Sequence, residues 1–238
     1  MSPSQQAMLV DYCPHCLNAG GVAAVRIPGQ AWPAGHHGIC GDNWALAQPR
    51  PHEAGGRHYT GTIGGVYEEG AVIPITVTVT TSHSGDWSFR ICKIQGGGIA
   101  EETAQLTENC LNEHVLTQAA VPGAQNPGDR WYHTGSSGAG TYTFNYQLPA
   151  GLNCDGVTTK CVMQWYWLTG NSCLPPGEPA QWVLDPTMAT CGVAQGYPEE
   201  FFNCADIVIK ASGAEQKETL PASLSSAGAC AGICSRPG

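Results

Sequence analysis

Apolar and polar residues alternate along the segment AVIPITVTVTTSHSGDWSFRICKI in the first half of the chain. Such alternation is typical of strands with one buried face, because successive side chains of a strand point to opposite sides. The segment predicts a strand that runs to about residue 81, a turn at the letters SHSGD, and a returning strand. The apolar positions of the two strands are Val72, Ile75, Val77, Val79, Trp87, Phe89 and Ile91. The pattern therefore predicts a hairpin with His83 at its tip.

Three later segments have the same β character. The segment GTYTFNYQLP places its aromatic residues on one face, CVMQWYWLTGN is a dense run of β-prone residues, and CADIVIKA alternates again. One face of this last segment carries Ala205, Ile207 and Ile209, and the other carries Asp206, Val208 and Lys210. The strands are joined by Gly- and Pro-rich connections and no segment has a helical period. The sequence therefore predicts an all-β fold, a β-sandwich of two packed sheets.

Residues 1–70 show little periodicity and predict long loops. Turn-forming clusters such as WPAGHHG and AQPRPHEAGG separate short apolar pieces. Such loops are usually held by disulfides or carry a binding surface. From about residue 213 the composition turns to Ala, Ser and Gly. We expect one domain over 1–212 and a C-terminal tail or linker over 213–238 that holds a Cys pair, Cys230 and Cys234.

The composition excludes several classes of protein. Only 12% of the residues are charged, and the 31 glycines and 17 prolines favour short strands joined by turns over long amphipathic helices. The net charge is -9 and no Lys/Arg cluster offers contacts to phosphates, so we expect neither nucleic acid nor a membrane as a partner. No apolar run approaches the roughly 18 to 20 residues of a membrane span.

The chain has 12 cysteines, spread over its whole length. An even number with this distribution favours disulfides and an oxidising compartment. The CxxC motif of Cys13 and Cys16 leaves two alternatives open, a redox pair or half of a zinc site. A redox motif normally follows a buried strand, which MLVDY is too short to form, and a zinc site needs a second close pair. The nearest such pair is Cys230 and Cys234, at the other end of the chain.

Among eight histidines, His83 has the most informative position. It lies at a predicted strand end, where a rigid sheet can hold a side chain for binding. His36 and His37 are adjacent, so their side chains point apart, and a loop-structuring hydrogen bond explains His52 as well as a ligand role would. The motifs of serine hydrolases, zinc proteases and phosphate-binding loops are absent, and paired carboxylates are contiguous, as in solvated turns. A metal at His83 is therefore the chemistry for which the sequence offers a ligand.

A set of motifs follows in a fixed order: DYCPHCLNAGG, HGICGD, RPHEAGG, TTSHSGDWSFRIC, YQLPAGLNCDGVTTKCVMQWYWLTGNSC and EEFFNCADIVI. In this order they resemble the lytic polysaccharide monooxygenases of the chitin-binding type-4 group. Auxiliary activity family 15 is the most similar and family 10 is more distant. The resemblance covers roughly residues 2–211. It implies that the domain 1–212 is an immunoglobulin- or fibronectin III-like β-sandwich with long disulfide-pinned loops.

The resemblance also implies a cofactor and a substrate. Members hold one copper ion with the amine and imidazole of an N-terminal histidine and the imidazole of a second histidine, which His83 matches. Phe201 matches the aromatic residue that blocks an axial position of the copper, and Thr81 matches a small residue beside it. Nitrogen ligation of this kind favours Cu(II) over zinc. The implied function is that of a secreted copper enzyme that oxidatively cleaves chitin or a related β-1,4-glycan such as cellulose, on a flat face rather than in a pocket.

The start of the chain departs from the family pattern. Relatives begin with His-Gly, whereas SPSQQAM matches a later segment, with Gln5 near a usual arginine. Met1 offers an amine but no imidazole, and the first residues do not resemble a secretory signal. We expect the chain as given to be incomplete, with a native protein that starts at an upstream histidine. Two alternatives stay open: a non-catalytic polysaccharide-binding or extracellular structural protein, and a cytosolic metal or thiol protein that uses CPHC.

Aromatic residues in the early loops are candidates for polysaccharide binding, because flat rings stack on sugar faces. These candidates are Trp32, Trp44 and Tyr59. The alternative for each is a packed anchor of its loop.

Overall fold

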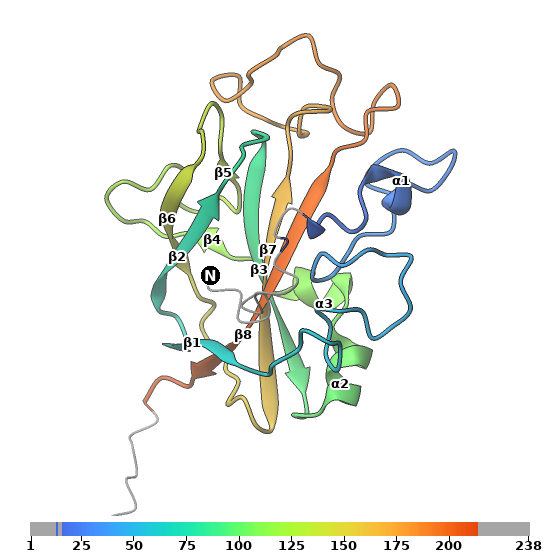
Figure 1. The fold of residues 1–238 in the computed structure, drawn as a ribbon. Coiled ribbons are helices and arrows are strands. Elements are labelled where there is room, and N and C mark those ends of the chain that lie inside the picture. The colour runs from blue at the N-terminus through green and yellow to red at the C-terminus, as the bar shows by residue number, and fades with distance from the viewer. Residues whose placement is uncertain (1–12, 14–15, 214–238) are drawn as a thin grey trace, which may run out of the picture.

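The computed structural model describes residue 13 and residues 16–213, which form two β-sheets packed face to face (Figure 1). The larger sheet contains β1 (Ile63–Glu68), β3 (Asp86–Gln95), β5 (Tyr132–His133), β7 (Thr159–Leu168) and β8 (Glu200–Lys210). The smaller sheet contains β2 (Val72–Val79), β4 (Thr117–Gln118) and β6 (Gly140–Gln147). Short helices α1 (Val22–Val25), α2 (Ile99–Gln105) and α3 (Glu108–Glu113) complete the described elements. The expected all-β sandwich is confirmed.

The two sheets differ in their strand directions. The strand order of the larger sheet is β1-β8-β7-β3-β5, and that of the smaller sheet is β2-β6-β4. All pairs are antiparallel except β1 with β8, which run parallel. Within the described part of the chain, no helix has the length and apolar character needed to cross a membrane.

The main hydrophobic core fills the space between the sheets. The smaller sheet contributes Ile73, Ile75, Val77, Val79, Phe144 and Tyr146. The larger sheet contributes Trp87, Phe89, Ile91, Met163, Trp167, Phe201, Ile207 and Ile209. Each of these side chains alternates with an outward-pointing neighbour, as the sequence pattern indicated. Burying an aliphatic or aromatic side chain of this size contributes about 1.5 to 3 kcal/mol, so this layer holds the two sheets together.

The expected hairpin between the first two predicted strands is wrong. Strand β2 pairs with β6 in one sheet, whereas β3 pairs with β5 and β7 in the other. Residues 80–85 therefore cross from one sheet to the other, and His83 lies on this crossover. Val72 is also placed differently, because its side chain is 44% exposed while the buried face of β2 begins at Ile73.

Strand β8 begins four residues before the segment CADIVIKA that predicted it. This extension places Phe201 inside a strand, paired with Trp167 of β7, and Glu200 paired with Leu168. Phe201 points into the main core, and Glu200 points to the opposite face of the larger sheet. The candidate site residue Phe201 is therefore held by the main-chain ladder of the sheet.

The outer face of the larger sheet is covered by the loop-rich N-terminal region and by α2 and α3 (Figure 1). The described cysteines form the disulfides Cys13–Cys16, Cys40–Cys204, Cys92–Cys110, Cys154–Cys161 and Cys173–Cys191. The expected disulfides are thus confirmed, including one across the CxxC motif. Residues 214–238, with the expected tail and its Cys pair, lie outside the described residues, as do residues 1–12.

Candidate active site

His83 lies at one end of the sandwich, where the crossover enters β3. The N–H of Gly170 donates a hydrogen bond to the His83 carbonyl at 3.0 Å, and the next two residues, Ser84 and Gly85, have positive φ angles of 49° and 83°. A Cβ atom at Gly85 would lie 2.1 Å from the carbonyl oxygen of Leu168, so only glycine fits there. This tight turn holds His83 beside the end of β7.

Two aromatic rings of the larger sheet pack against the imidazole of His83. The ring centroids of His83 and Phe201 are 5.9 Å apart, with 9° between the ring planes. Those of His83 and Trp167 are 5.6 Å apart, with 41° between the planes. The indole Nε1 of Trp167 also donates to the carbonyl of Ser84 at 2.7 Å. The paired strands β7 and β8 therefore fix both the ring and the main chain of the crossover.

Asn171, which the sequence analysis missed, orients the imidazole. Its Nδ2 lies 2.9 Å from Nδ1 of His83, and its Oδ1 accepts hydrogen bonds from the hydroxyls of Thr169 and Ser172 at 2.9 and 3.1 Å. The letters LTGN after a predicted strand were the available signal. Nothing local in the sequence indicates that Asn171 meets a histidine 88 positions away.

His83 fits one ligand position of a copper site. Because Nδ1 faces Asn171, Nε2 is the nitrogen left for a metal, and no residue of the described ranges hydrogen-bonds to it. Metal binding at Nε2 requires the proton on Nδ1. Asn171 accepts that proton when its amide turns to present Oδ1, and the hydroxyls of Thr169 and Ser172 then accept from Nδ2. Imidazole suits copper, and the Phe201 ring walls the site without offering a ligand.

The structure brings two of the three residues matched to the copper site into contact. His83 and Phe201 stack, as described above, whereas Thr81 is exposed on the crossover and makes no ring contact or hydrogen bond with His83. Within the described ranges, no other histidine contacts His83. The described residues therefore supply one imidazole and two aromatic rings, those of Phe201 and Trp167, to the candidate site.

Glu200, next to Phe201, is the centre of a buried polar cluster on the outer face of the sheet. Its carboxylate accepts hydrogen bonds from Trp32 Nε1 at 3.2 Å and from the hydroxyl of Tyr166, and lies 2.7 Å from His37 Nδ1. Burial lowers the pKa of His37, but the hydrogen bond and charge of Glu200 outweigh it and raise the pKa from 6.5 to about 9. His37 is therefore a charged partner of Glu200 at neutral pH.

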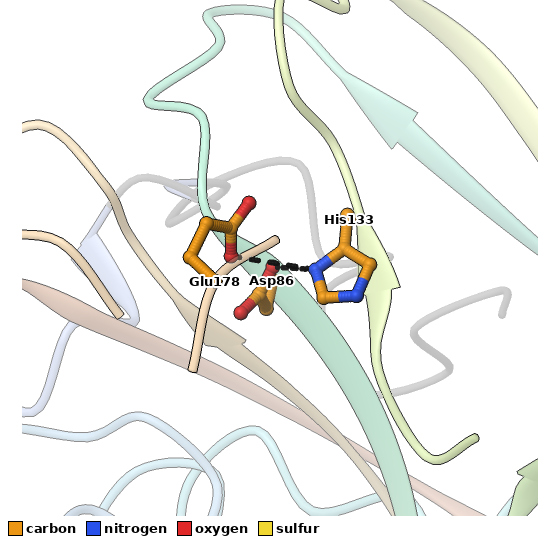
Figure 2. Close-up of side chains that lie close together, drawn as sticks. All are labelled: Asp86, His133 and Glu178. Atoms are coloured by element: carbon orange, nitrogen blue, oxygen red, sulfur yellow. Dashed lines mark hydrogen bonds and ion pairs between the residues drawn. The ribbon is translucent and has the colours of Figure 1, made fainter. Parts of the chain in front are cut away.

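A second buried cluster on this face joins Asp86, His133 and Glu178 (Figure 2). Nδ1 of His133 lies 2.8 Å from Asp86 Oδ1 and 3.3 Å from Glu178 Oε2. Burial raises the pKa of Asp86, with a further rise from Glu178 that the charge of His133 opposes. Burial lowers the pKa of His133, and the two carboxylates outweigh it and raise the pKa above its usual range. No pattern in the sequence connects these three residues, which come from β3, β5 and the loop before β8.

Most of the other residues considered for metal or polysaccharide binding anchor a loop instead. His52 binds Asp42 through Nδ1 at 2.7 Å, which confirms the loop-structuring alternative for this histidine. The hydroxyl of Tyr59 accepts a hydrogen bond from Lys160 at 2.8 Å, and Trp32 binds Glu200. Trp44 differs, because it is 38% exposed and its ring is stacked on His36 with 4.6 Å between centroids.

Comparison with known proteins establishes the family. The family described as "Lytic polysaccharide mono-oxygenase, cellulose-degrading" matches residues 3–207. The chain belongs to the lytic polysaccharide monooxygenases. It is also similar to a solved structure, the lytic polysaccharide monooxygenase AA15 from Thermobia domestica in the Cu(I) state. That similarity has 30% sequence identity and a TM-score of 0.55, and covers 74% of this chain and 76% of that one. Comparison with curated protein sequences gives no match.

Family membership confirms the resemblance of the sequence motifs. It identifies the chain in general terms as a copper-dependent monooxygenase that acts on polysaccharide, in a family whose members are generally secreted. Residues 3–207 span the described sandwich almost completely, so the family match covers the crossover with His83 and the start of β8 with Phe201.

Proposed function

We propose that this lytic polysaccharide monooxygenase uses His83 as a copper ligand and Phe201 as the aromatic wall of the copper site, and that it cleaves chitin or a related β-1,4-glycan. The parallel stack of the two rings at one end of the sandwich carries the proposal. The Nδ1 contact with Asn171 supports it, because it leaves Nε2 of His83 for the metal.

Each residue of the site has a separate task. Copper, when bound, supplies the redox chemistry by which a reductant and dioxygen or peroxide oxidise a C–H bond of the glycan. His83 provides a neutral imidazole nitrogen, and Asn171 keeps the ring turned toward the metal. Phe201 and Trp167 cover one side of the imidazole with apolar surface and so exclude water from it.

The proposed substrate follows from the sequence motifs, which resemble the chitin-binding type-4 group. The description of the matching family names cellulose, so the two β-1,4-glycans are the substrates to compare. Trp44 is the exposed aromatic candidate for stacking on a sugar ring. The disulfides support an oxidising, extracellular location for the domain.

A polysaccharide-binding protein without redox chemistry is the second candidate. One observation favours it: the described residues bring a single imidazole, that of His83, to the site, whereas the copper site implied by the family resemblance uses two. Binding to chitin without a tight copper site and without oxidised products supports this second function.

The test compares the natural protein, with the amino terminus found in its source, with the variant His83→Ala. Cu(II) binding is measured by calorimetry and electron paramagnetic resonance, and oxidised sugars are measured by mass spectrometry on chitin and on cellulose. We expect His83→Ala to lose one bound Cu(II) per chain, the electron paramagnetic resonance signal of that ion and product formation, with little change in unfolding temperature.

The matched control is His114→Ala, since His114 is a half-buried histidine at the end of α3. This variant should bind copper as the natural protein does. The same Cu(II) stoichiometry and the same electron paramagnetic resonance spectrum in the natural protein and in His83→Ala would contradict the proposed ligand role.

A further inference from the structure

We propose that Asp86, His133 and Glu178 form a second metal site, which takes a divalent first-row transition ion of the Zn²⁺ type. The ion would join the start of β3, strand β5 and the loop 169–199. This inference does not depend on the proposed copper site, because it uses none of the same side chains.

The geometry of the three side chains suits such an ion. One ligand atom from each residue can be chosen so that all three lie within 4.8 Å of one another. Zinc bonds to nitrogen and carboxylate oxygen are about 2.0 to 2.2 Å long, which places neighbouring ligand atoms of a tetrahedral site about 3.4 Å apart. Nδ1 of His133 lies 2.8 Å from Asp86 Oδ1 and 3.3 Å from Glu178 Oε2, so small movements complete the site. Figure 2 shows both carboxyl groups beside the imidazole, from three separate parts of the chain.

The burial of these side chains is an independent indication that the cluster binds an ion. The exposed fractions of the side chains are 4% for Asp86, 5% for His133 and 4% for Glu178. Oε1 of Glu178 is buried and has no hydrogen-bond partner among the described residues. A buried carboxylate oxygen without a partner is costly, and buried charges are normally paired or coordinate metals. The ring of Trp182 lies over His133 at 6.2 Å between centroids and closes the cluster further.

Charge and donor chemistry select the class of ion. Two carboxylates and a neutral imidazole carry a charge of −2, which a divalent cation balances in full. One imidazole among two carboxylates suits Zn²⁺ or Co²⁺ better than Ca²⁺ or Mg²⁺, which prefer oxygen ligands alone. The absence of a thiolate or thioether in the trio disfavours Cu(I).

The position of the trio indicates what the ion would do. Thr134, next to His133, donates its N–H and its hydroxyl to the carbonyl of Gly85, each at 2.8 Å, so β5 is bound to the crossover that carries His83. Glu178 belongs to the same loop as Asn171, the partner of His83, and the Cys173–Cys191 disulfide closes this loop on itself. An ion at the trio would fasten the loop to the sheet at Asp86, the first residue of β3 and three residues after His83.

The alternative is an ion-free cluster in which protonated His133 pairs with the carboxylates. Metal binding distinguishes the two, because the Nδ1 proton must leave before His133 can bind an ion. The experiment uses the whole chain carrying His83→Ala, after chelator treatment, so that the copper-site imidazole cannot contribute. Zn²⁺ is titrated calorimetrically in buffers of different ionisation enthalpy, and Co²⁺ is titrated with detection of its visible d–d bands.

We expect one Zn²⁺ per chain, release of at least one proton, a Co²⁺ spectrum of low coordination number and a raised unfolding temperature. Adding Glu178→Gln or His133→Gln to this background should weaken Zn²⁺ binding tenfold or more and remove the thermal shift. The control is Glu108→Gln, which removes a carboxylate that pairs with Arg90 elsewhere on the same face. The protein with this substitution should bind Zn²⁺ as tightly as the His83→Ala protein does. Two results would overturn the proposal: no Zn²⁺ or Co²⁺ binding by the His83→Ala protein, or equal binding after loss of Glu178. The first result does not require either added variant to fold.

Discussion

Trp167 and Phe201 are paired across β7 and β8, and the rings of both contact the imidazole of His83. The ladder of the sheet fixes the relative position of the pair, so a histidine on a loop-like crossover is held by the most regular part of the fold. Side chains supported in this way are held within the small range of positions and angles that a metal site needs. Substitutions of the supporting residues should therefore alter the site without removing a ligand.

Replacing Phe201 with Ala should destabilise the domain and change the surroundings of the copper. Phe201 is buried in the main core, and Phe-to-Ala changes at such positions cost about 3 to 5 kcal/mol. Urea unfolding measures the loss, and the electron paramagnetic resonance spectrum of bound Cu(II) reports the newly open side of the imidazole.

The adjacent variant Phe202→Ala is the matched control, because Phe202 is equally buried on the opposite face of β8, against Tyr166. It should lose similar stability and leave the Cu(II) spectrum unchanged. A Phe201→Ala spectrum identical to that of the unaltered protein would contradict the role of Phe201 as a wall of the site.

Replacing Asn171 with Ala should weaken copper binding with little effect on folding. Asn171 is exposed, but it holds Nδ1 of His83, and loss of such an outer partner typically costs tenfold to a hundredfold in metal affinity. Competitive Cu(II) titration measures this loss. Ser172→Ala removes a hydroxyl that binds Asn171 rather than His83, and should lower the affinity less. Equal losses in the two variants would place the effect in the loop and not in the contact with His83.

The strands were predictable because alternation is a local property. The alternation of β2 and the aromatic face of β6 follow from spacing alone. Both strands are confirmed, although the buried face of β2 begins at Ile73 and not at Val72. The partner of a strand is not a local property, and this is why a short segment between β2 and β3 predicted a hairpin where the chain crosses between sheets. The position of His83 at a strand end was predicted. Of its neighbours, the family resemblance indicated Phe201, and nothing in the sequence indicated Trp167 or Asn171.

The contacts of the site depend on residues far apart in the sequence. Phe201 was matched through the family motif EEFFNCADIVI, and the structure shows that it stacks on His83 from a strand 118 positions later. Asn171 and Asp86 lie inside family motifs, and His133 and Glu178 lie outside them. In neither case does the sequence show which residues they meet, because each is an ordinary polar residue until folding brings the others to it. Their proximity is decided by the pairing of β3 with β5 and by the path of the loop 169–199.

The pair of His37 and Glu200 should make stability fall as the pH rises through the alkaline range. The pKa of His37 is about 9 in the folded protein and about 6.5 when unfolded. The folded state therefore binds the proton more tightly, and its contribution is complete below pH 6.5 and lost by about pH 9. We expect a loss on the order of 1 to 3 kcal/mol across this window relative to His37→Gln. Urea unfolding at pH 6, 7.5 and 9.5 measures the difference, and parallel curves for the two proteins would refute it.

The carboxyl group of Asp206 should make the stability of the domain fall as the pH rises. An ordinary paired carboxylate has the opposite effect on stability. It lies on the outer face of β8, its Oδ1 is buried without a partner among the described residues, and burial raises its pKa to about 6. The negative charge of Glu102 raises this pKa further, and that of nearby Lys160 lowers it only in part. Because the folded state holds the proton more tightly than the unfolded state, stability should fall as the pH rises from about 4 to 6 and stay reduced above that range.

The variant Asp206→Asn removes this titration while keeping the shape of the side chain. Relative to the unaltered protein it should gain on the order of 1 kcal/mol above pH 6 and nothing near pH 4, since a buried neutral amide costs less than a buried unpaired carboxylate. The control Asp185→Asn changes a fully exposed carboxylate in the loop before β8 and should not reproduce the gain. Thermal unfolding of the three proteins at pH 4, 5, 6 and 7.5 gives the comparison. A gain that is the same at every pH would show that the charge of Asp206 is not its cause.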